Sequence, residues 1–125
     1  MKKEITTCSQ APAAIGPYSQ GVSWNGLLFL SGQLGMDPET GLLREDLEGQ
    51  AEQIFTNIEA ILAHEGLDMT HILKATVFLT DMNQFATVNR IYEQRVPAPY
   101  PARSAFAVAA LPKGALVEIE VIVHR

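Results

Sequence analysis

Two adjacent residues, Asn25 and Gly26, constrain the possible folds of this chain more than any other feature of its sequence. They separate two short apolar runs, residues 21–24 and 27–31. Asn-Gly between apolar runs is the strongest local signal for a β-hairpin, because both residues tolerate the positive φ angles of a two-residue turn. The sequence therefore predicts an antiparallel hairpin, and the fold must build a sheet around it.

Further segments have the pattern of strands. Residues 117–123 carry Val or Ile at every second position, and residues 71–80 also alternate. This period of two predicts strands with one apolar face. Residues 103–108 follow a proline-rich break and are expected to form another strand, and Ile5 is expected to open a short one. The apolar face of the 71–80 strand is expected to carry Leu73, Ala75, Val77 and Leu79.

Two segments have the pattern of amphipathic helices. Residues 46–65 place five apolar side chains on one face, and Gly66 follows where a helix commonly ends. Asp81 is expected to begin the second helix, with Gln84 completing a capping box. The apolar stripes consist of Ile54, Phe55, Ile58, Ile61 and Leu62 in the first helix and of Phe85, Val88 and Tyr92 in the second.

The order of these elements predicts an α+β fold: a single domain over residues 1–125, with a mixed β-sheet and two helices packed on one of its faces. The helices leave the second face of the sheet uncovered. That face is half apolar, with Phe78 and Ile122 among its expected members. Uncovered apolar surface commonly marks an interface. We therefore expect an oligomer whose sheets face one another, and a site built from two chains would fit this arrangement.

Several classes of function are disfavoured by the sequence. The net charge is −5 and the basic residues are scattered, so no basic face for a nucleic acid is expected. No apolar stretch is long enough to span a membrane. The single cysteine, Cys8, is typical of a reducing compartment, so we expect a cytoplasmic protein. Neither metal-ligand spacing nor a phosphate-binding or serine-hydrolase motif is present, which disfavours a zinc site, a nucleotide or phosphate site, and a serine hydrolase.

Arg103 and Glu118 are the strongest candidates for chemistry. Arg103 opens an apolar strand, where a guanidinium is partly desolvated unless it meets an anion, and arginine binds a carboxylate through two parallel hydrogen bonds. Glu118 lies in a strand of alternating apolar residues, where half-burial can tune a carboxyl group for acid–base catalysis. The alternative interpretations are a surface or interface ion pair for Arg103 and a solvated sheet face for Glu118.

Other polar residues have two possible roles each. The Ser31 hydroxyl could bind a ligand or bond a turn, and Gly32 allows a ligand or backbone to approach closely. Tyr18 could donate to a ligand or anchor its loop. Asn89, beside the stripe of the second helix, is expected to bond the backbone of a neighbouring loop. Cys8 is a weak nucleophile candidate, because no histidine is near it in the sequence.

Four segments together resemble the RidA (YjgF-type) imine deaminase family. The first three are APAAIGPYSQ at residues 11–20, SGQ at residues 31–33 and FATVN at residues 85–89. The fourth runs from PARS at residues 101–104 through LP at residues 111–112 to EIE at residues 118–120. The resemblance extends from about Glu4 to Val123, and its C-terminal block is specific.

The resemblance implies a chorismate-mutase-like fold, a homotrimer with clefts between subunits, and chemistry without cofactor or metal. RidA-type enzymes hydrolyse 2-iminobutanoate and 2-iminopropanoate to 2-oxo acids and ammonia. By position, Arg103 matches the carboxylate-binding arginine and Glu118 the acid–base carboxylate. The residues that match the substrate pocket are Tyr18, Ser31, Gly32, Asn89, Arg103, Ser104 and Ala105.

One position departs from the family pattern, because Ala105 stands where cysteine is common. We expect that position to contribute mainly backbone, so hydrolysis should survive. Three alternatives to an imine deaminase remain: a non-catalytic regulator that binds a 2-oxo acid or amino acid, a purely structural trimer or holdase, and an RNA-cleaving enzyme. The acidic pI of about 5.1 disfavours the last of these.

Overall fold

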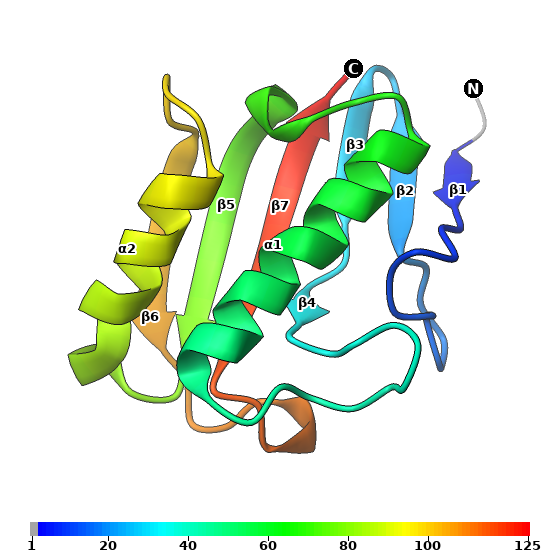
Figure 1. The fold of residues 1–125 in the computed structure, drawn as a ribbon. Coiled ribbons are helices and arrows are strands. Elements are labelled where there is room, and N and C mark those ends of the chain that lie inside the picture. Colours follow the sequence, from blue (N-terminus) through cyan, green and yellow to red (C-terminus); the bar gives the residue numbers. More distant parts are fainter. Residues whose placement is uncertain (1–2) are drawn as a thin grey trace.

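The structure is a computed structural model, and it describes residues 3–125. Within these residues seven strands form one sheet, against which two α-helices pack (Figure 1). The strands are β1 (Glu4–Thr6), β2 (Gly21–Trp24), β3 (Leu27–Leu30), β4 (Gln33–Leu34), β5 (Ile72–Leu79), β6 (Ala102–Ala107) and β7 (Val117–His124), the α-helices are α1 (Leu47–His64) and α2 (Phe85–Arg95), and 3-10 turns cover Met69–His71, Met82–Gln84 and Pro112–Gly114.

The sheet is mixed, as the sequence predicts. Its order is β1-β2-β3-β7-β5-β6, and β4 also pairs with β7. The β2–β3 hairpin turns at Asn25 and Gly26, whose φ angles of 52° and 81° are those that the Asn-Gly signal requires. Only β5 and β6 run parallel among the described strands, and α2 supplies the crossover that a parallel pair needs. The predicted α+β class is therefore confirmed.

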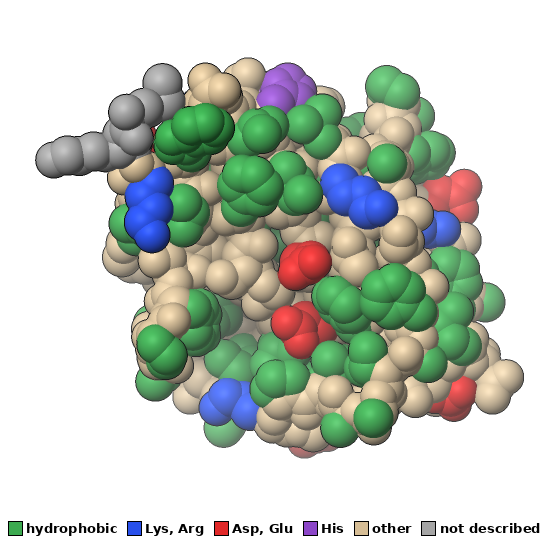
Figure 2. All heavy atoms as spheres, turned by 180° about the vertical axis from the view of Figure 1, so that it is seen from behind, with side chains coloured by type: hydrophobic (Ala, Val, Ile, Leu, Met, Phe, Trp, Pro, Cys, Tyr) green, Lys and Arg blue, Asp and Glu red, His purple; other side chains and the backbone are tan. Residues whose placement is uncertain are grey.

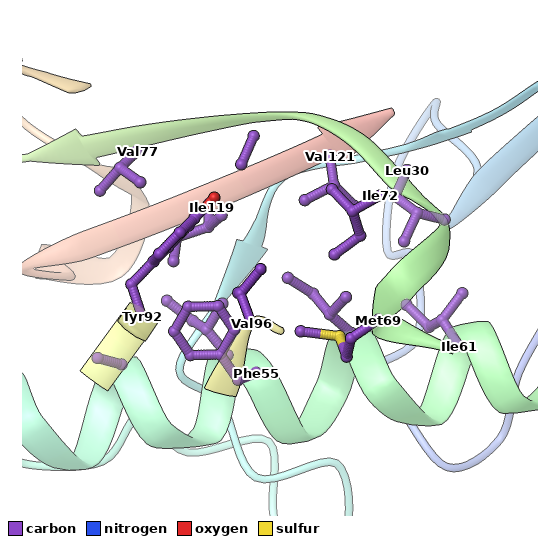
Figure 3. Packing of buried hydrophobic residues seen from close by; sticks show 14 of the residues in the cluster. Leu30, Phe55, Ile61, Met69, Ile72, Val77, Tyr92, Val96, Ile119 and Val121 are labelled. Atoms are coloured by element: carbon purple, nitrogen blue, oxygen red, sulfur yellow. The ribbon is translucent and has the colours of Figure 1, made fainter. Parts of the chain in front are cut away.

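The core lies between the two helices and the sheet face that they cover (Figures 1 and 3). Helix α1 begins after Asp46, whose side chain accepts a hydrogen bond from the Gly49 amide, and Gly66 follows its end with a φ of 74°. This confirms the helix predicted over residues 46–65. The apolar side of β7 meets the helices with Val117, Ile119, Val121 and Val123, all buried.

The second helix begins later than the sequence pattern predicts. Asp81 does accept a backbone hydrogen bond, but from Asn83, so it caps the 3-10 turn and not α2. Gln84 precedes α2 and makes no capping hydrogen bond with its side chain. The predicted capping box at Asp81 was therefore wrong, because the short aspartate side chain bonds the amide two residues ahead and starts a tighter turn.

Strand β5 also departs from strict alternation. Ile72 pairs with Val123 and Lys74 with Ile122, so Leu73 is an extra residue at a bulge. The bulge shifts the side-chain phase: Ile72 is buried, whereas Leu73 is 45% exposed. The prediction that Leu73 belongs to the buried face was wrong for this reason. The two-residue strand β4 was not predicted.

No helix of residues 3–125 covers the opposite face of the sheet, as predicted. Figure 2 shows this face, where apolar side chains surround acidic ones near its centre. Strand β7 contributes Glu118, Glu120 and Ile122 to it, and neither Phe78 nor Ile122 is fully buried. We call this surface the open face. A membrane-spanning helix is ruled out for residues 3–125, since none of the helices there is both long and apolar enough.

Candidate functional site

Arg103 lies on β6, and its side chain reaches over the helix-covered side of the sheet. It pairs with the buried Ala75 in the parallel ladder, so both side chains lie on one face. Its Nη1 donates to Oδ1 of Asn89 on α2 at 2.7 Å. Its guanidinium carbon lies 5.2 Å from the Phe85 ring centre and 4.7 Å from that of Tyr92. The expected desolvation is not seen in the single chain, because Arg103 remains exposed.

The hydrogen bond to Arg103 corrects the expectation for Asn89. The sequence suggested that the Asn89 amide bonds the backbone of a nearby loop, but its oxygen instead accepts from a guanidinium. A cavity of about 410 Å³ opens beside the pair. It is lined by Asn89, Tyr92, Glu93, Tyr100, Pro101 and Arg103. We call it the arginine pocket.

Glu118 lies on β7 and points to the open face. It pairs with Leu34 of β4 and with Phe78 of β5. Between the paired residues Phe29 and Gln33, three residues of the β3–β4 segment stand opposite two of β7, so the segment bulges there. Gly32 lies in this bulge, and a Cβ atom on it would overlap the Glu118 carboxylate. The glycine is therefore required for the close approach of the Glu118 side chain.

The electrostatic environment of Glu118 suits acid–base chemistry. Partial burial raises the pKa of its carboxyl group above the ordinary value, and the negative charge of Glu120 raises this pKa further. Glu120 lies two residues along the same strand and so on the same face. A carboxyl group whose pKa moves toward neutrality can both accept and return a proton. This was the role expected of Glu118 from its place in the sequence.

A second cavity, of about 440 Å³, includes Glu118. We call it the glutamate pocket. Ser31 donates its hydroxyl hydrogen to the carbonyl oxygen of Ser19 at 2.6 Å, so its Oγ can still accept a hydrogen bond from a ligand. Tyr18 is 54% exposed on the rim, and its ring does not anchor the loop in the core. Other residues that line the glutamate pocket include Pro12, Ile15, Gln20, Gly32, Gln33, Pro112 and Lys113.

The predicted site residues thus form two groups. Arg103 and Asn89 line the arginine pocket, whereas Tyr18, Ser31, Gly32 and Glu118 line the glutamate pocket. Arg103 points to the helix side of the sheet and Glu118 to the open face. One chain therefore presents these residues in two separate pockets.

The two residues after Arg103 divide between the faces of the sheet. Lys74 Nζ donates a hydrogen bond to Ser104 Oγ at 3.0 Å. Ser104 pairs with Thr76 of β5, so the side chains of these two residues lie on the same face of the sheet. Ala105 pairs with the buried Val77 and packs against the core. The side chain of Ser104 therefore points away from that of Arg103, and only its backbone can contribute on the Arg103 side.

Two contacts of Arg103 were not predicted from the sequence. Phe85 and Tyr92 were assigned to the apolar stripe of the second helix, yet both rings lie against Arg103. Their spacing with Asn89, at i, i+4 and i+7, is the signal that could have placed all three on one helix row. Cys8 is buried and its sulfur lies 3.6 Å from the Ala60 carbonyl oxygen, so it is a structural residue. No metal-binding cluster is present among residues 3–125.

The chain is similar to known proteins over nearly its whole length. The family model described as endoribonuclease L-PSP matches residues 8–125. A bovine 2-iminobutanoate/2-iminopropanoate deaminase is 50% identical over 96% of this chain and 88% of its own length. The chloroplastic Reactive Intermediate Deaminase A of Arabidopsis thaliana is also 50% identical, over 98% of this chain, which spans 66% of that protein.

A solved structure has the same fold. The crystal structure of RidA from the Antarctic bacterium Psychrobacter sp. is 47% identical, with a TM-score of 0.95, and the match covers 98% of this chain and 99% of that one. The family model and these relatives each cover nearly the whole chain. The chain therefore belongs to the endoribonuclease L-PSP family, the RidA (YjgF-type) family that its motifs resemble.

Proposed function

We propose that this protein is an imine deaminase that hydrolyses 2-iminobutanoate and 2-iminopropanoate to 2-oxo acids and ammonia. The observation that carries the proposal is that the Arg103 guanidinium is held in place but, within the described part of the chain, has most of its hydrogen-bond donors free. Its guanidinium is held by Asn89 and two rings, yet only one of its five N–H groups donates a hydrogen bond within residues 3–125. The remaining N–H groups are available for a carboxylate. The bovine and goat relatives, each 50% identical and named 2-iminobutanoate/2-iminopropanoate deaminase, support this choice of substrate.

The proposed reaction uses residues of both pockets. Arg103 binds the substrate carboxylate and so fixes the imine carbon. Glu118 takes a proton from a water molecule as that water attacks the imine carbon, and the imine nitrogen receives a proton from Glu118 or through Tyr18 or Ser31. Collapse of the resulting amino alcohol breaks the carbon–nitrogen bond and releases ammonia and the 2-oxo acid. Such positioned acid–base catalysis supplies roughly 10²- to 10⁴-fold acceleration.

A complete site on this scheme needs two chains. Arg103 and Glu118 lie on opposite sides of the sheet within one chain. The open face carries apolar side chains that no element of residues 3–125 covers, including Phe29, which is 44% exposed, and Phe106, which is 47% exposed. Because β6 is an edge strand of the sheet, we infer that a neighbour packed on the open face and against this edge brings its glutamate pocket beside the arginine pocket. We infer a homotrimer with three equivalent clefts, a closed symmetry that such a repeated contact can reach.

Two other roles fit the chain less well. A regulator that only binds a 2-oxo acid would use Arg103 in the same way, but it would not need the raised pKa of Glu118. An RNA-cleaving enzyme would need a basic groove, whereas the net charge here is −5. We therefore infer a small imino acid as the ligand and no nucleic-acid partner. We also infer chemistry without a metal or cofactor, as the family resemblance implies, and a cytoplasmic location in keeping with the single cysteine.

The direct test follows the decay of an imine. A threonine dehydratase generates 2-iminobutanoate in the assay, and its concentration is followed with and without this protein. We expect faster decay with the folded protein and the spontaneous rate with the heat-denatured protein. Decay at the spontaneous rate in the presence of pure, folded protein would contradict the proposal.

Replacing Glu120 with glutamine is expected to shift the pH dependence of kcat/KM. If deprotonated Glu118 activates water, kcat/KM rises with pH through the pKa of Glu118. The charge of Glu120 raises that pKa, so removing the charge lowers the pKa. The acid limb of the profile should therefore move to lower pH. Glu45→Gln removes the same charge from an exposed position outside both pockets, and it should leave the limb in place.

A further inference from the structure

Helix α2 contacts Arg103 with three residues in one row. Phe85, Asn89 and Tyr92 follow one another at i, i+4 and i+7 and so share a helix face. The guanidinium carbon lies 5.2 Å from one ring centre and 4.7 Å from the other, within the range of a cation–π contact. The Asn89 oxygen accepts a hydrogen bond from the same group. We call this row the arginine holder.

The innermost member of the holder is itself fixed. Tyr92 is only 4% exposed, and its ring meets that of Phe55 from α1 edge to face, with 5.9 Å between the ring centres. Figure 3 shows both rings between α1 and the sheet, with Tyr92 extending toward Ile119 of β7. Because α1 and the sheet brace the Tyr92 ring, this ring offers Arg103 a rigid surface.

The ring of Tyr92, and not its hydroxyl, makes this contact. The hydroxyl is buried and has no hydrogen-bond partner among the described residues. Burial raises the pKa of this hydroxyl, so it stays protonated and carries no charge that could pair with Arg103. A buried hydroxyl without a partner is unfavourable. The hydroxyl group therefore does not hold Tyr92 or Arg103 in place, and the contact between them is made by the ring.

We propose that Phe85 and Tyr92 are positioning residues for substrate binding. They fix the Arg103 guanidinium so that the N–H groups not bonded to Asn89 meet the substrate carboxylate in one orientation. An exposed arginine otherwise loses much side-chain entropy when it binds a ligand, and a side chain fixed beforehand loses less. The inference rests on the proposed function, because it specifies how the arginine pocket orients that substrate.

The first test compares ring removal with ring retention. In Tyr92→Leu and Phe85→Leu, we expect the inhibition constant of 2-oxobutanoate and the KM for the imine to rise about five- to tenfold, with kcat nearly unchanged. Tyr92→Phe keeps the ring and should restore wild-type binding. Ile91→Ala removes a buried side chain of the same helix that belongs to the core, so it should lower Tm without changing the inhibition constant.

A second measurement needs no ligand. The NMR relaxation of the Arg103 Nε–H group, assigned by its loss in Arg103→Lys, should report a rigid side chain in the wild type and in Tyr92→Phe, and a mobile one in both leucine variants. If the leucine variants leave the mobility of the Arg103 side chain and the inhibition constant of 2-oxobutanoate unchanged, the proposed role of the arginine holder is wrong even if the protein is a deaminase. A wild type that fails to hydrolyse imines but shows this pattern of mobility would refute the proposed function and leave the holder standing.

Discussion

Replacing Glu118 with glutamine is expected to lower kcat for imine hydrolysis by roughly 10²- to 10⁴-fold, the usual contribution of a positioned acid–base group. Glutamine has nearly the same shape, so it fits the bulge where Gly32 leaves room for the Glu118 side chain. It cannot take a proton from water. The variant should therefore lose the proton-transfer step while it keeps the fold and the pocket. Steady-state kinetics and Tm would be measured for the variant and the wild type.

The same variant separates the enzyme from a binding protein. Arg103 and Asn89 belong to the other pocket, so Glu118→Gln should keep the dissociation constant for 2-oxobutanoate within a few-fold of the wild-type value, measured by calorimetry. Glu45→Gln, a matched change at an exposed position, should alter neither kcat nor binding. Full turnover in Glu118→Gln would remove Glu118 from the mechanism and favour another proton acceptor in the glutamate pocket.

The parts of the fold that depend on local signals could be predicted from sequence. Asn25 and Gly26 specify the hairpin because their φ angles are a property of the two residues themselves. The ends of α1 are marked locally as well, by the side chain of Asp46, which accepts a hydrogen bond from the Gly49 amide, and by the positive φ angle of Gly66. The bulge at Leu73 could not be predicted, since it depends on how β5 pairs with β7 and not on the residues of β5 alone.

The candidate site was predictable as a set of residues but not as an arrangement. Arg103 and Glu118 could be chosen from residue chemistry and from the family resemblance. That they point to opposite faces depends on the parallel register of β6 on β5, which the sequence does not encode locally. The contact between Asn89 and Arg103 depends likewise on how α2 crosses β6. The arrangement of the site therefore depends on how strands and helices pair and pack, which the sequence pattern of each element does not specify.

Mixing two inactive variants is expected to restore activity. Arg103→Ala lacks the carboxylate clamp and Glu118→Gln lacks the proton acceptor, so each alone should be nearly inactive. In mixed oligomers, a cleft that combines Arg103 from one chain with Glu118 from its neighbour is intact. For equal amounts and random assembly, about a quarter of the clefts should be intact, giving about a quarter of the wild-type kcat per site. The two chains would be refolded together from denaturant and assayed for imine decay.

A matched mixture decides whether the site is shared between chains. The double variant Arg103→Ala/Glu118→Gln, refolded with an equal amount of wild type, should also give about a quarter of the activity if each cleft takes one residue from each of two chains. If both residues act within one chain, this mixture should give about half, and the mixture of single variants should stay inactive. Since Arg103 and Glu118 point to opposite faces of the sheet, we expect the first result. The second would mean that a rearrangement of β6 brings the two side chains of one chain together.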